Sequence, residues 1–209
     1  MMDGNAQKNP AIIFDLGGVL LDWNPRYLYR KIFNGDEEKV DFFLKEICPQ
    51  SWNMRQDTGY PTVKAIEERC QLFPAYSEAI HAYYERYPET VKGEIAGTVA
   101  ILGELREAGY TLCALSNWSA ETFNLVRGKF PFLKWFDEMV ISGEVGLAKP
   151  DKDIFMLAAQ RVGRAPADCL FIDDLPVNIE AAREYGFQTI HFISPQELHD
   201  EMKKRKIFA

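Results

Sequence analysis

Cysteine and histidine are scarce in this sequence of 209 residues, which contains four cysteines and three histidines. The cysteines lie far apart, no CxxC occurs, and no cysteine and histidine have the spacing of a zinc site. This scarcity argues against a zinc-binding motif. Cys113 and Cys169 lie inside apolar runs, so we expect both to be buried thiols of the core.

Long apolar runs and a basic surface are also missing. No segment approaches the ~20 apolar residues of a membrane helix, and the N-terminal segment MMDGNAQKNP lacks the apolar stretch of a signal peptide. We therefore expect a cytoplasmic protein that does not bind a membrane. Lysine and arginine number 24 against 31 acidic residues, giving a formal net charge of −7. This charge argues against binding nucleic acid through its phosphates.

Short apolar runs separated by helical patterns are present instead. Hydrophobic residues make up 47% of the chain and charged residues 26%, a balance typical of a packed domain. Buried strands are predicted at 11–14, 111–115, 139–141, 169–172 and 189–193, because these runs do not alternate. Helices are predicted between them, among others at 151–162 and 179–185. The order predicts an α/β fold, a doubly wound, Rossmann-like parallel sheet with right-handed crossovers.

The stretch 24–94 interrupts this alternation and is too long for a structureless loop. Its apolar residues recur at helical spacing, for example between 40 and 47. We predict an α/β core formed by 1–22 and 95–209, and a small helical cap at 23–94. A cap that closes over the strand ends acts as a lid, so Arg26 and Arg55 are candidates to contact the leaving group of a substrate. Nothing in the sequence indicates an oligomeric state.

Polar side chains follow the predicted strands at the points where the strands end. Ligands of an open parallel sheet bind beyond the carboxyl ends of its strands, so these positions are candidates for chemistry. Taken alone, an aspartate or a Ser-Asn pair after a strand is more often a turn or helix-capping residue, and Lys149 could be a lysine of a surface loop. Their joint occurrence at successive strand ends indicates one site. The set contains three carboxylates, an ammonium group, a hydroxyl and an amide, namely Asp15, Asp173, Asp174, Lys149, Ser116 and Asn117.

The chemistry of this set points to phosphate and a metal ion. Three carboxylates at close range cannot all ionise without a cation, and Mg²⁺ is the usual choice beside phosphate. Lys149 supplies a positive charge for a dianionic substrate, and Ser116 and Asn117 can donate hydrogen bonds to phosphoryl oxygens. Asp15 is placed to act as a nucleophile, and the backbone carbonyl of Gly17 can bind the metal.

The chain resembles the haloacid dehalogenase-like hydrolase superfamily in four motifs that keep the family's order. They are FDLGGVL (Phe14–Leu20), LSN (Leu115–Asn117), GLAKPDKDIF (Gly146–Phe155) and FIDDLPVNIEAAREYGF (Phe171–Phe187). The helical insert sits where that family places its first-type cap, as in its subfamily I. The last motif looks most like the phosphatase branches, which include bacterial glucose-1-phosphate phosphatases and the phosphatase domain joined to epoxide hydrolases.

The resemblance implies a Mg²⁺-dependent phosphatase that hydrolyses a small phosphorylated metabolite, such as a sugar phosphate, through an aspartyl-phosphate intermediate. It implies a role for each motif residue. Asp15 matches the nucleophile and a metal ligand, and the Gly17 position offers its backbone carbonyl to Mg²⁺. Ser116, with Asn117 beside it, matches the phosphate-binding hydroxyl, and Lys149 matches the lysine that holds nucleophile and phosphate. Asp174 matches an acidic metal ligand, and so does Asp173, directly or through water.

The sequence departs from the family pattern at Gly17, where phosphatases commonly carry an aspartate as general acid and base. Such catalysis is typically worth ~10²–10⁴ in rate. Either the substrate has a good leaving group, such as an anomeric sugar oxygen, or another residue supplies the proton. Asp22, Asp57 and His81 are candidates.

Two other functions are considered. A 2-haloacid dehalogenase also uses an aspartate nucleophile and lacks an acid at the position of Gly17, but it has no use for the paired carboxylates of Asp173 and Asp174. A weakly active binding or regulatory protein is compatible with the loss of the acid at Gly17. His191 and His199 are remote from the motifs in sequence, and we expect both to be structural.

Overall fold

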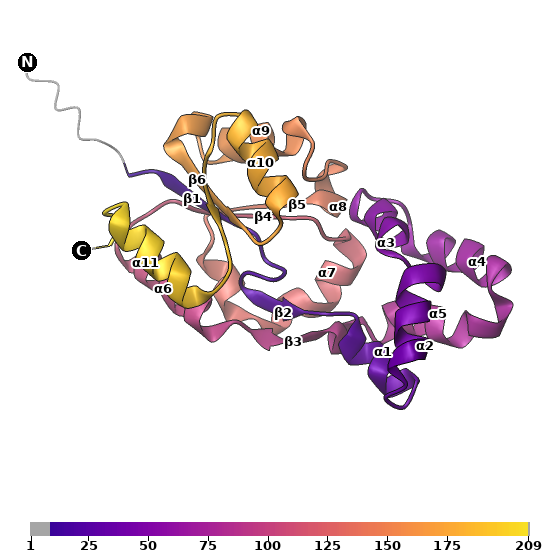
Figure 1. Cartoon of the computed structure of the whole chain (residues 1–209). Helices are drawn as coiled ribbons and strands as arrows, with labels where there is room; N and C mark the ends of the chain where they lie inside the picture. The colour runs from indigo at the N-terminus through magenta and orange to yellow at the C-terminus, as the bar shows by residue number, and fades with distance from the viewer. Residues whose placement is uncertain (1–8, 209) are drawn as a thin grey trace, which may run out of the picture.

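The computed structural model describes residues 9–208 and places a five-stranded sheet at the centre of the molecule (Figure 1). The strand order is β5-β4-β1-β6-β7, and all neighbouring strands run parallel. The predicted fold class is therefore confirmed. The strands are β1 (Ala11–Phe14), β4 (Leu112–Ser116), β5 (Glu138–Ile141), β6 (Cys169–Asp173) and β7 (Gln188–His191).

Helices cover both faces of this sheet because side chains along each strand alternate between two apolar clusters. Ile13 of β1 belongs to the cluster under α9 (Lys152–Arg161) and α10 (Pro176–Glu184). Ile12 belongs to the other cluster, on the side of α6 (Ala96–Glu107) and α11 (Pro195–Lys204) (Figure 1). Burial of a large apolar side chain stabilises a fold by ~1.5–3 kcal/mol, so these layers hold the central strand in place.

Several predicted element boundaries are corrected by the structure. The last strand ends at His191, not at 193, and the side chain of Ile193 is 65% exposed. The helix predicted at 179–185 begins earlier, at Pro176, because proline fits the first turn of a helix. Cys113 and Cys169 are buried, as predicted.

The insert is connected to the core by two short antiparallel strands, β2 (Leu21–Trp23) and β3 (Val91–Glu94). Its helices lie together beside the sheet (Figure 1). The predicted boundaries at 22/23 and 94/95 fall within or just after these strands, and the division into two domains stays a prediction. The helices of the insert are α1 (Arg26–Ile32), α2 (Glu37–Phe42), a π-helical segment (Phe43–Ile47), α3 (Gln50–Asp57), α4 (Thr62–Leu72) and α5 (Ser77–Glu85).

Shorter elements complete the fold. Within residues 9–208, no helix combines the length and the apolar character needed to cross a membrane. Two short helices follow β4 and β5, namely α7 (Ala120–Val126) and α8 (Ser142–Val145). Single 3₁₀ turns lie at Pro74–Tyr76, Tyr87–Thr90, Arg127–Lys129, Pro131–Trp135 and Pro166–Asp168.

Candidate active site

Three central strands deliver polar side chains to one edge of the sheet. Phe14 of β1 pairs with Ala114 of β4 and Ile172 of β6, so the three strands end in register. Asp15, Ser116 and Asp173 therefore emerge together, and all three are buried. The structure thus brings together residues that lie more than 150 positions apart in the sequence, as the parallel topology predicts.

Lys149 joins two of these carboxylates. Its Nζ lies 3.1 Å from Oδ2 of Asp15 and donates a 2.6 Å hydrogen bond to Oδ2 of Asp173. It also donates a 3.0 Å bond to the backbone carbonyl of Leu115. Burial by itself lowers the pKa of Lys149, but the charges of Asp15 and Asp173 outweigh burial and raise it above the ordinary lysine value. The ammonium group is a permanent positive charge beside Asp15.

Asp173 is saturated with hydrogen bonds. Besides the bond from Lys149, it accepts bonds from the Asn178 amide to both oxygens, at 3.0 and 3.1 Å, and from the Leu175 backbone N–H at 2.8 Å. This arrangement shows that Asp173 holds Lys149. Its contact with a metal stays a prediction. The role of Asn178 as a partner of Asp173 did not follow from the sequence.

Asp15 has a carboxyl group whose charge is costly in its surroundings. Desolvation by burial raises its pKa to about 7, and the nearby Asp173 and Asp174 add to the rise. Lys149 and a hydrogen bond with Ser116 act in the opposite direction. Oδ1 also accepts a 2.7 Å bond from the Leu16 backbone N–H. A bound cation would favour the ionised form further.

The carboxylates of Asp15, Asp173 and Asp174 each offer an oxygen, and these oxygens lie within 4.8 Å of one another. Lys149 compensates one of the three formal charges, which leaves a net negative site. Asp174 is the least buried of the three, and its pKa is raised by burial and by the charge of Asp173. An oxygen-only, net-negative set of this kind fits a hard divalent cation.

Two neighbouring glycines shape this site in different ways. A Cβ added at Gly17 would have no atom within 4 Å, so the position has room for a side chain. Gly18 has a φ of +75°, and a Cβ there would lie 2.4 Å from Oδ2 of Asp174. Gly18 is therefore required for the close approach of the loop to Asp174. Sequence reasoning missed this role, because the contact joins two distant segments.

Asn117 is engaged with the backbone of Lys149. Its side-chain oxygen accepts a 2.8 Å bond from the Lys149 N–H, and its Nδ2 donates a 2.8 Å bond to the Lys149 carbonyl. This reciprocal pair fixes the loop that carries Lys149. The phosphate contact predicted for Asn117 stays a prediction.

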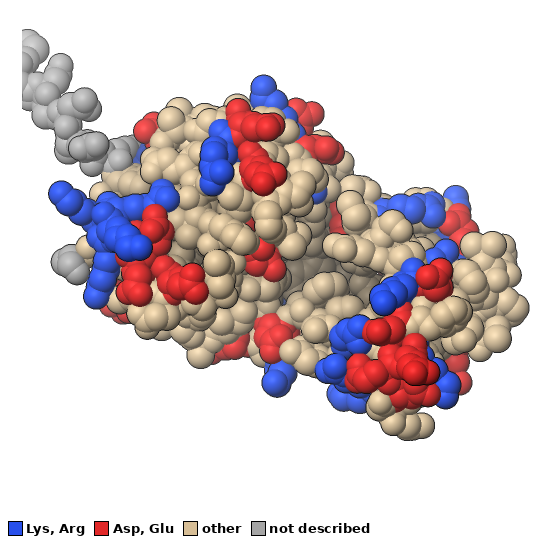
Figure 2. All heavy atoms as spheres, viewed as in Figure 1, with Lys and Arg blue, Asp and Glu red and all other residues tan. Residues whose placement is uncertain are grey.

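The two arginines of the insert are paired with acids. Arg26 forms ion pairs with Glu37 and Asp41, and Arg55 forms one with Glu68. Charges of both signs are mixed on the surface where α1 and α2 lie (Figure 2). The substrate contact predicted for these arginines stays a prediction.

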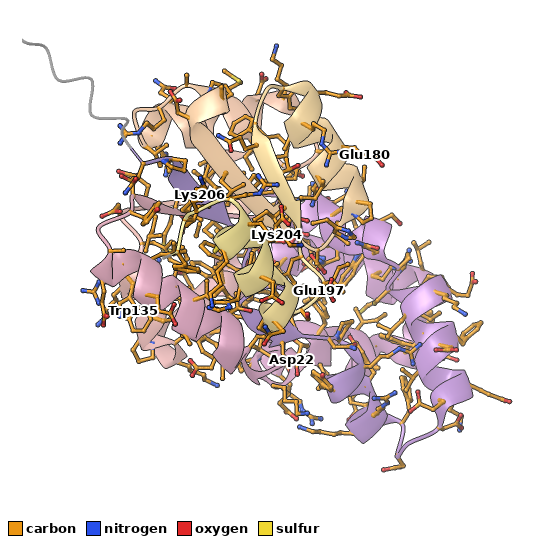
Figure 3. The ribbon with its side chains drawn as sticks, turned by 60° about the vertical axis from the view of Figure 1, so that its left-hand side comes forward. Asp22, Trp135, Glu180, Glu197, Lys204 and Lys206 are labelled. Carbon is orange, nitrogen blue, oxygen red and sulfur yellow. The ribbon has the colours of Figure 1, made fainter. Side chains whose placement is uncertain are left out.

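The three candidates for a replacement acid lie outside the carboxylate group of Asp15, Asp173 and Asp174. Asp22 accepts a 2.8 Å bond from the Tyr27 hydroxyl and lies at the connection between core and insert (Figure 3). His81 is exposed on α5. Asp57 is buried at the end of α3.

His191 lies closer to the site than its sequence position indicates. It pairs with Asp173 in the β6–β7 ladder, and its Nε2 lies 3.0 Å from the backbone carbonyl of Asp174. The expectation that His191 is structural stays a prediction. The sequence signal for this proximity is that His191 lies within the fifth predicted strand, 189–193.

The insert contains a cavity of about 220 Å³. Aromatic side chains form much of its wall, and two amides contribute polar atoms. Its lining consists of Trp23, Pro25, Leu44, Cys48, Gln50, Trp52, Asn53 and Tyr83.

Comparison with known families and proteins shows similarity to haloacid dehalogenase-like hydrolases. The family model of haloacid dehalogenase-like hydrolases matches residues 10–186. The chain is 24% identical over 184 residues to a phosphorylated carbohydrates phosphatase of Thermotoga maritima, covering 87% of this chain and 83% of that protein. It is 25% identical to (S)-2-haloacid dehalogenase 1 of a Pseudomonas species, covering 86% of this chain and 82% of that protein.

A longer relative and two solved structures are also similar. Acyl-CoA dehydrogenase family member 10 of Mus musculus is 33% identical over 210 residues, which cover 92% of this chain and only 19% of that protein. A predicted HAD-like family hydrolase from Porphyromonas gingivalis superposes with a TM-score of 0.74 at 24% identity, covering 96% and 98% of the two chains. An enzyme of Bacteroides thetaiotaomicron, solved with magnesium and inorganic phosphate, gives a TM-score of 0.66 at 25% identity, covering 89% and 95%.

Proposed function

The chain belongs to the haloacid dehalogenase-like hydrolase family, and on that premise we propose that it is a Mg²⁺-dependent phosphatase of a small phosphorylated metabolite. The observation that carries this proposal is the contact between Lys149 and Asp15 beside a cluster of three carboxylates. A buried nucleophile, a fixed cation and a net-negative oxygen cluster together suit phosphoryl transfer, which depends on positioning and charge.

In the proposed reaction, a carboxylate oxygen of Asp15 attacks phosphorus and the bond from phosphorus to the ester oxygen breaks. The ester oxygen leaves as an alkoxide, which takes up a proton from water to become the alcohol, and a phosphoryl group remains on Asp15. Water then attacks the phosphorus, which releases inorganic phosphate and restores the carboxylate. Lys149 lowers the pKa of Asp15, which favours its ionised form, and balances the charge of the phosphoryl oxygens.

The carboxylates of Asp15 and Asp174 and the carbonyl of Gly17 are the groups that we assign to Mg²⁺. Asp173 contributes mainly through Lys149, because its oxygens already accept four hydrogen bonds. Bound Mg²⁺ supplies positive charge at the phosphoryl group. We assign to the hydroxyl of Ser116, at the end of β4, a hydrogen bond to a phosphoryl oxygen of the substrate.

The organic part of the substrate is assigned to the insert. Its aromatic cavity supports this assignment, since Trp23, Trp52 and Tyr83 offer flat faces for a sugar ring or an apolar group. The free space at Gly17 favours a substrate whose alcohol leaves easily, such as a sugar 1-phosphate, because no acid stands at that position to protonate it. Both points stay proposals about substrate class.

A 2-haloacid dehalogenase is the second candidate, and the similarity to a Pseudomonas dehalogenase favours it. Both reactions begin with attack by an aspartate, but the dehalogenase attacks carbon and needs no cation. The net-negative carboxylate cluster has no role in that reaction. The phosphatase is therefore the better-supported of the two.

One assay separates these functions. Phosphate release from an aryl phosphate is measured with Mg²⁺, with EDTA, and with the Asp15→Asn variant, and halide release from a 2-haloacid is measured in parallel. We expect phosphate release that requires both Mg²⁺ and Asp15, and no halide release. Metal-independent activity, full activity of Asp15→Asn, or halide release alone would overturn the proposal.

A further inference from the structure

Asp57 is a buried carboxyl group of the insert that bonds to the core. It ends α3, and its side chain is 8% exposed. Oδ1 accepts a 3.0 Å bond from the backbone N–H of Ser119, and Oδ2 accepts a 3.2 Å bond from Asn53. Asn53 in turn accepts a hydrogen bond from the hydroxyl of Tyr83. A chain of three hydrogen bonds therefore joins the cavity of the insert to the core.

A second bond runs in the opposite direction between the same two parts. The backbone N–H of Thr62, the first residue of α4, donates a 3.1 Å bond to Oε1 of Glu121 in the first turn of α7. Ser119 is the N-cap residue of α7, and neither α4 nor α7 is capped by the side chain of its own N-cap residue. Each part thus supplies a carboxylate to an N–H at the start of the other part's helix.

The segment that Asp57 contacts leads directly from the proposed phosphate site. Each of its three residues is held by a different element. Asn117 is paired with the Lys149 backbone, the Trp118 N–H donates a 2.8 Å bond to the Ser142 hydroxyl, and the Ser119 N–H donates to Asp57. The insert is therefore one of three supports of the segment 117–119.

Close packing limits how this segment can relax if one support is lost. A Cβ at Gly143 of α8 would lie 2.4 Å from the backbone nitrogen of Ala120 and 2.8 Å from the Trp118 carbonyl. The backbone of segment 117–119 is thus packed between α8 and the insert. If the insert moves, either this segment moves with it or the hydrogen bond between Ser119 and Asp57 breaks.

We propose that Asp57 is a positioning residue that ties the docked insert to segment 117–119, so that docking and the geometry of the phosphate site are coupled. The bond from Thr62 to Glu121 is the second half of the same connection. This inference rests on the proposed phosphatase function for its kinetic consequences, but the docking contact itself does not. Asp57 acts through Ser119 and does not replace the acid missing at Gly17, because both of its oxygens are already engaged.

Docking of the insert is also coupled to protonation of Asp57. Burial raises the pKa of Asp57 to about 7, although the bond from Ser119 opposes the rise. In an undocked insert the carboxyl group is in water and has its ordinary pKa of ~3.9. At a pH between these two pKa values, docking therefore takes up a proton. The free energy of docking becomes less favourable as the pH rises toward 7, and it does not change further above pH 7.

The groups around Asp57 do not provide a compensating positive charge. Burial, with a smaller contribution from the charge of Asp57, raises the pKa of the phenols of Tyr83 from α5 and of Tyr87, which precedes β3, so both stay neutral. Asn53 from α3 is an amide, and Glu121 from α7 offers a carboxyl group that accepts the Thr62 N–H. From α8, Glu144 is paired with Arg127 at 3.8 Å. The pH dependence of docking is thus assigned to Asp57.

The test compares Asp57→Ala with Asp57→Asn, an uncharged isostere that can still accept the Ser119 bond. Hydrogen exchange of the Ser119 amide reports docking directly. We expect its protection to fall at least about tenfold in Asp57→Ala and to be retained in Asp57→Asn, with the pH dependence between 5 and 7 lost in the latter. Glu85→Gln, which changes an exposed carboxylate of α5, is the matched control. Wild-type protection in Asp57→Ala would overturn the proposal.

Kinetics test the coupling to the phosphate site. In Asp57→Ala we expect at least a roughly tenfold rise in KM and in the inhibition constant of inorganic phosphate, with a smaller change in kcat, and near-normal values in Asp57→Asn. Lost protection with unchanged phosphate affinity would overturn the coupling. An inactive wild-type enzyme would instead refute the phosphatase proposal, and the exchange measurement would still decide whether Asp57 docks the insert.

Discussion

Nζ of Lys149 lies 3.1 Å from Oδ2 of Asp15, and both side chains are almost completely buried. The two residues come from different strand connections, and the contact depends on the parallel order of β4, β1 and β6. Two opposite charges removed from water in this way need each other, because either one alone would be very costly to bury. The central chemical feature of the site is thus also a feature of its stability.

Lys149→Met should therefore lower stability as well as activity. The substitution keeps much of the side-chain volume but leaves Asp15 and Asp173 buried without their cation. We expect a loss of about 3–5 kcal/mol in the free energy of unfolding, measured by urea denaturation. Phosphatase activity should fall at least about 10²-fold.

The control for that experiment is Lys152→Met, which removes an exposed lysine at the start of α9. It should leave both stability and activity close to wild type. If Lys149→Met unfolds at the same urea concentration as the control, the ion pair does not contribute to stability as described.

Gly17→Asp should improve the turnover of substrates with poor leaving groups. A Cβ added at Gly17 would have no atom within 4 Å, and the backbone there is not left-handed, so an aspartate can be accommodated. A general acid at this point would add up to about 10²–10⁴ in rate for alkyl phosphates, and little for aryl phosphates. The ratio of kcat/KM between the two substrate types measures the effect.

Two further variants show whether that effect is chemical. Gly17→Asn adds a side chain of the same shape without an acid and should not change the ratio. Gly18→Ala should reduce activity toward every substrate, because its Cβ would meet Asp174. An unchanged ratio in Gly17→Asp would show that the missing acid is not limiting.

The stability of the fold should depend on pH through Asp57. Its pKa is about 7 in the folded protein and ordinary in the unfolded chain, so the folded state binds the proton more tightly. The contribution of Asp57 to the free energy of unfolding is fully present below the pKa of the unfolded chain. It is lost as the pH rises through 7, and the loss is at most about 4 kcal/mol.

The pKa of Asp15 is also raised in the folded protein, so Asp15 contributes a pH dependence in the same direction. The slope of unfolding free energy against pH in the wild type therefore does not identify Asp57 by itself. The difference in unfolding free energy between wild type and Asp57→Asn isolates the contribution of Asp57. This difference should shift in favour of Asp57→Asn between pH 5 and pH 8. A difference that does not change with pH contradicts the assigned shift.

Arg26→Ala and Arg55→Ala test the two substrate contacts that the structure leaves as predictions. Either replacement should raise KM or change the ranking of substrates if the arginine meets the leaving group. Both arginines are paired with exposed acids of the insert, so their loss should change stability by only about 1 kcal/mol or less. Unchanged kinetics would remove that arginine from the site.

The residues that gather at the sheet edge could be predicted because parallel topology and chain order determine them. Apolar runs identified the strands, and the residue after each run then had to lie at the carboxyl edge. Asp15, Ser116 and Asp173 meet for this reason, and Lys149 joins them from the connection that follows β5.

The different contacts that neighbouring residues of the site make could not be predicted from the sequence. Asp173 and Asp174 are neighbours in the chain, yet one is saturated by Lys149 and Asn178 and the other is partly exposed. The bond from Ser119 to Asp57 likewise depends on how the insert packs on the core. Such contacts join segments far apart in sequence, and no local pattern specifies them.

The central claim is that Asp15 carries a phosphoryl group during turnover, and acid quenching with an aryl phosphate tests it most directly. The alcohol leaves readily from this substrate, whereas no base stands at Gly17 to activate water, so the intermediate should accumulate. With Mg²⁺ we expect a burst of the aryl alcohol and a phosphoryl group on the peptide containing Asp15, both abolished by EDTA or by Asp15→Asn. A phosphoryl group on another residue, or the same burst in Asp15→Asn, would contradict the account.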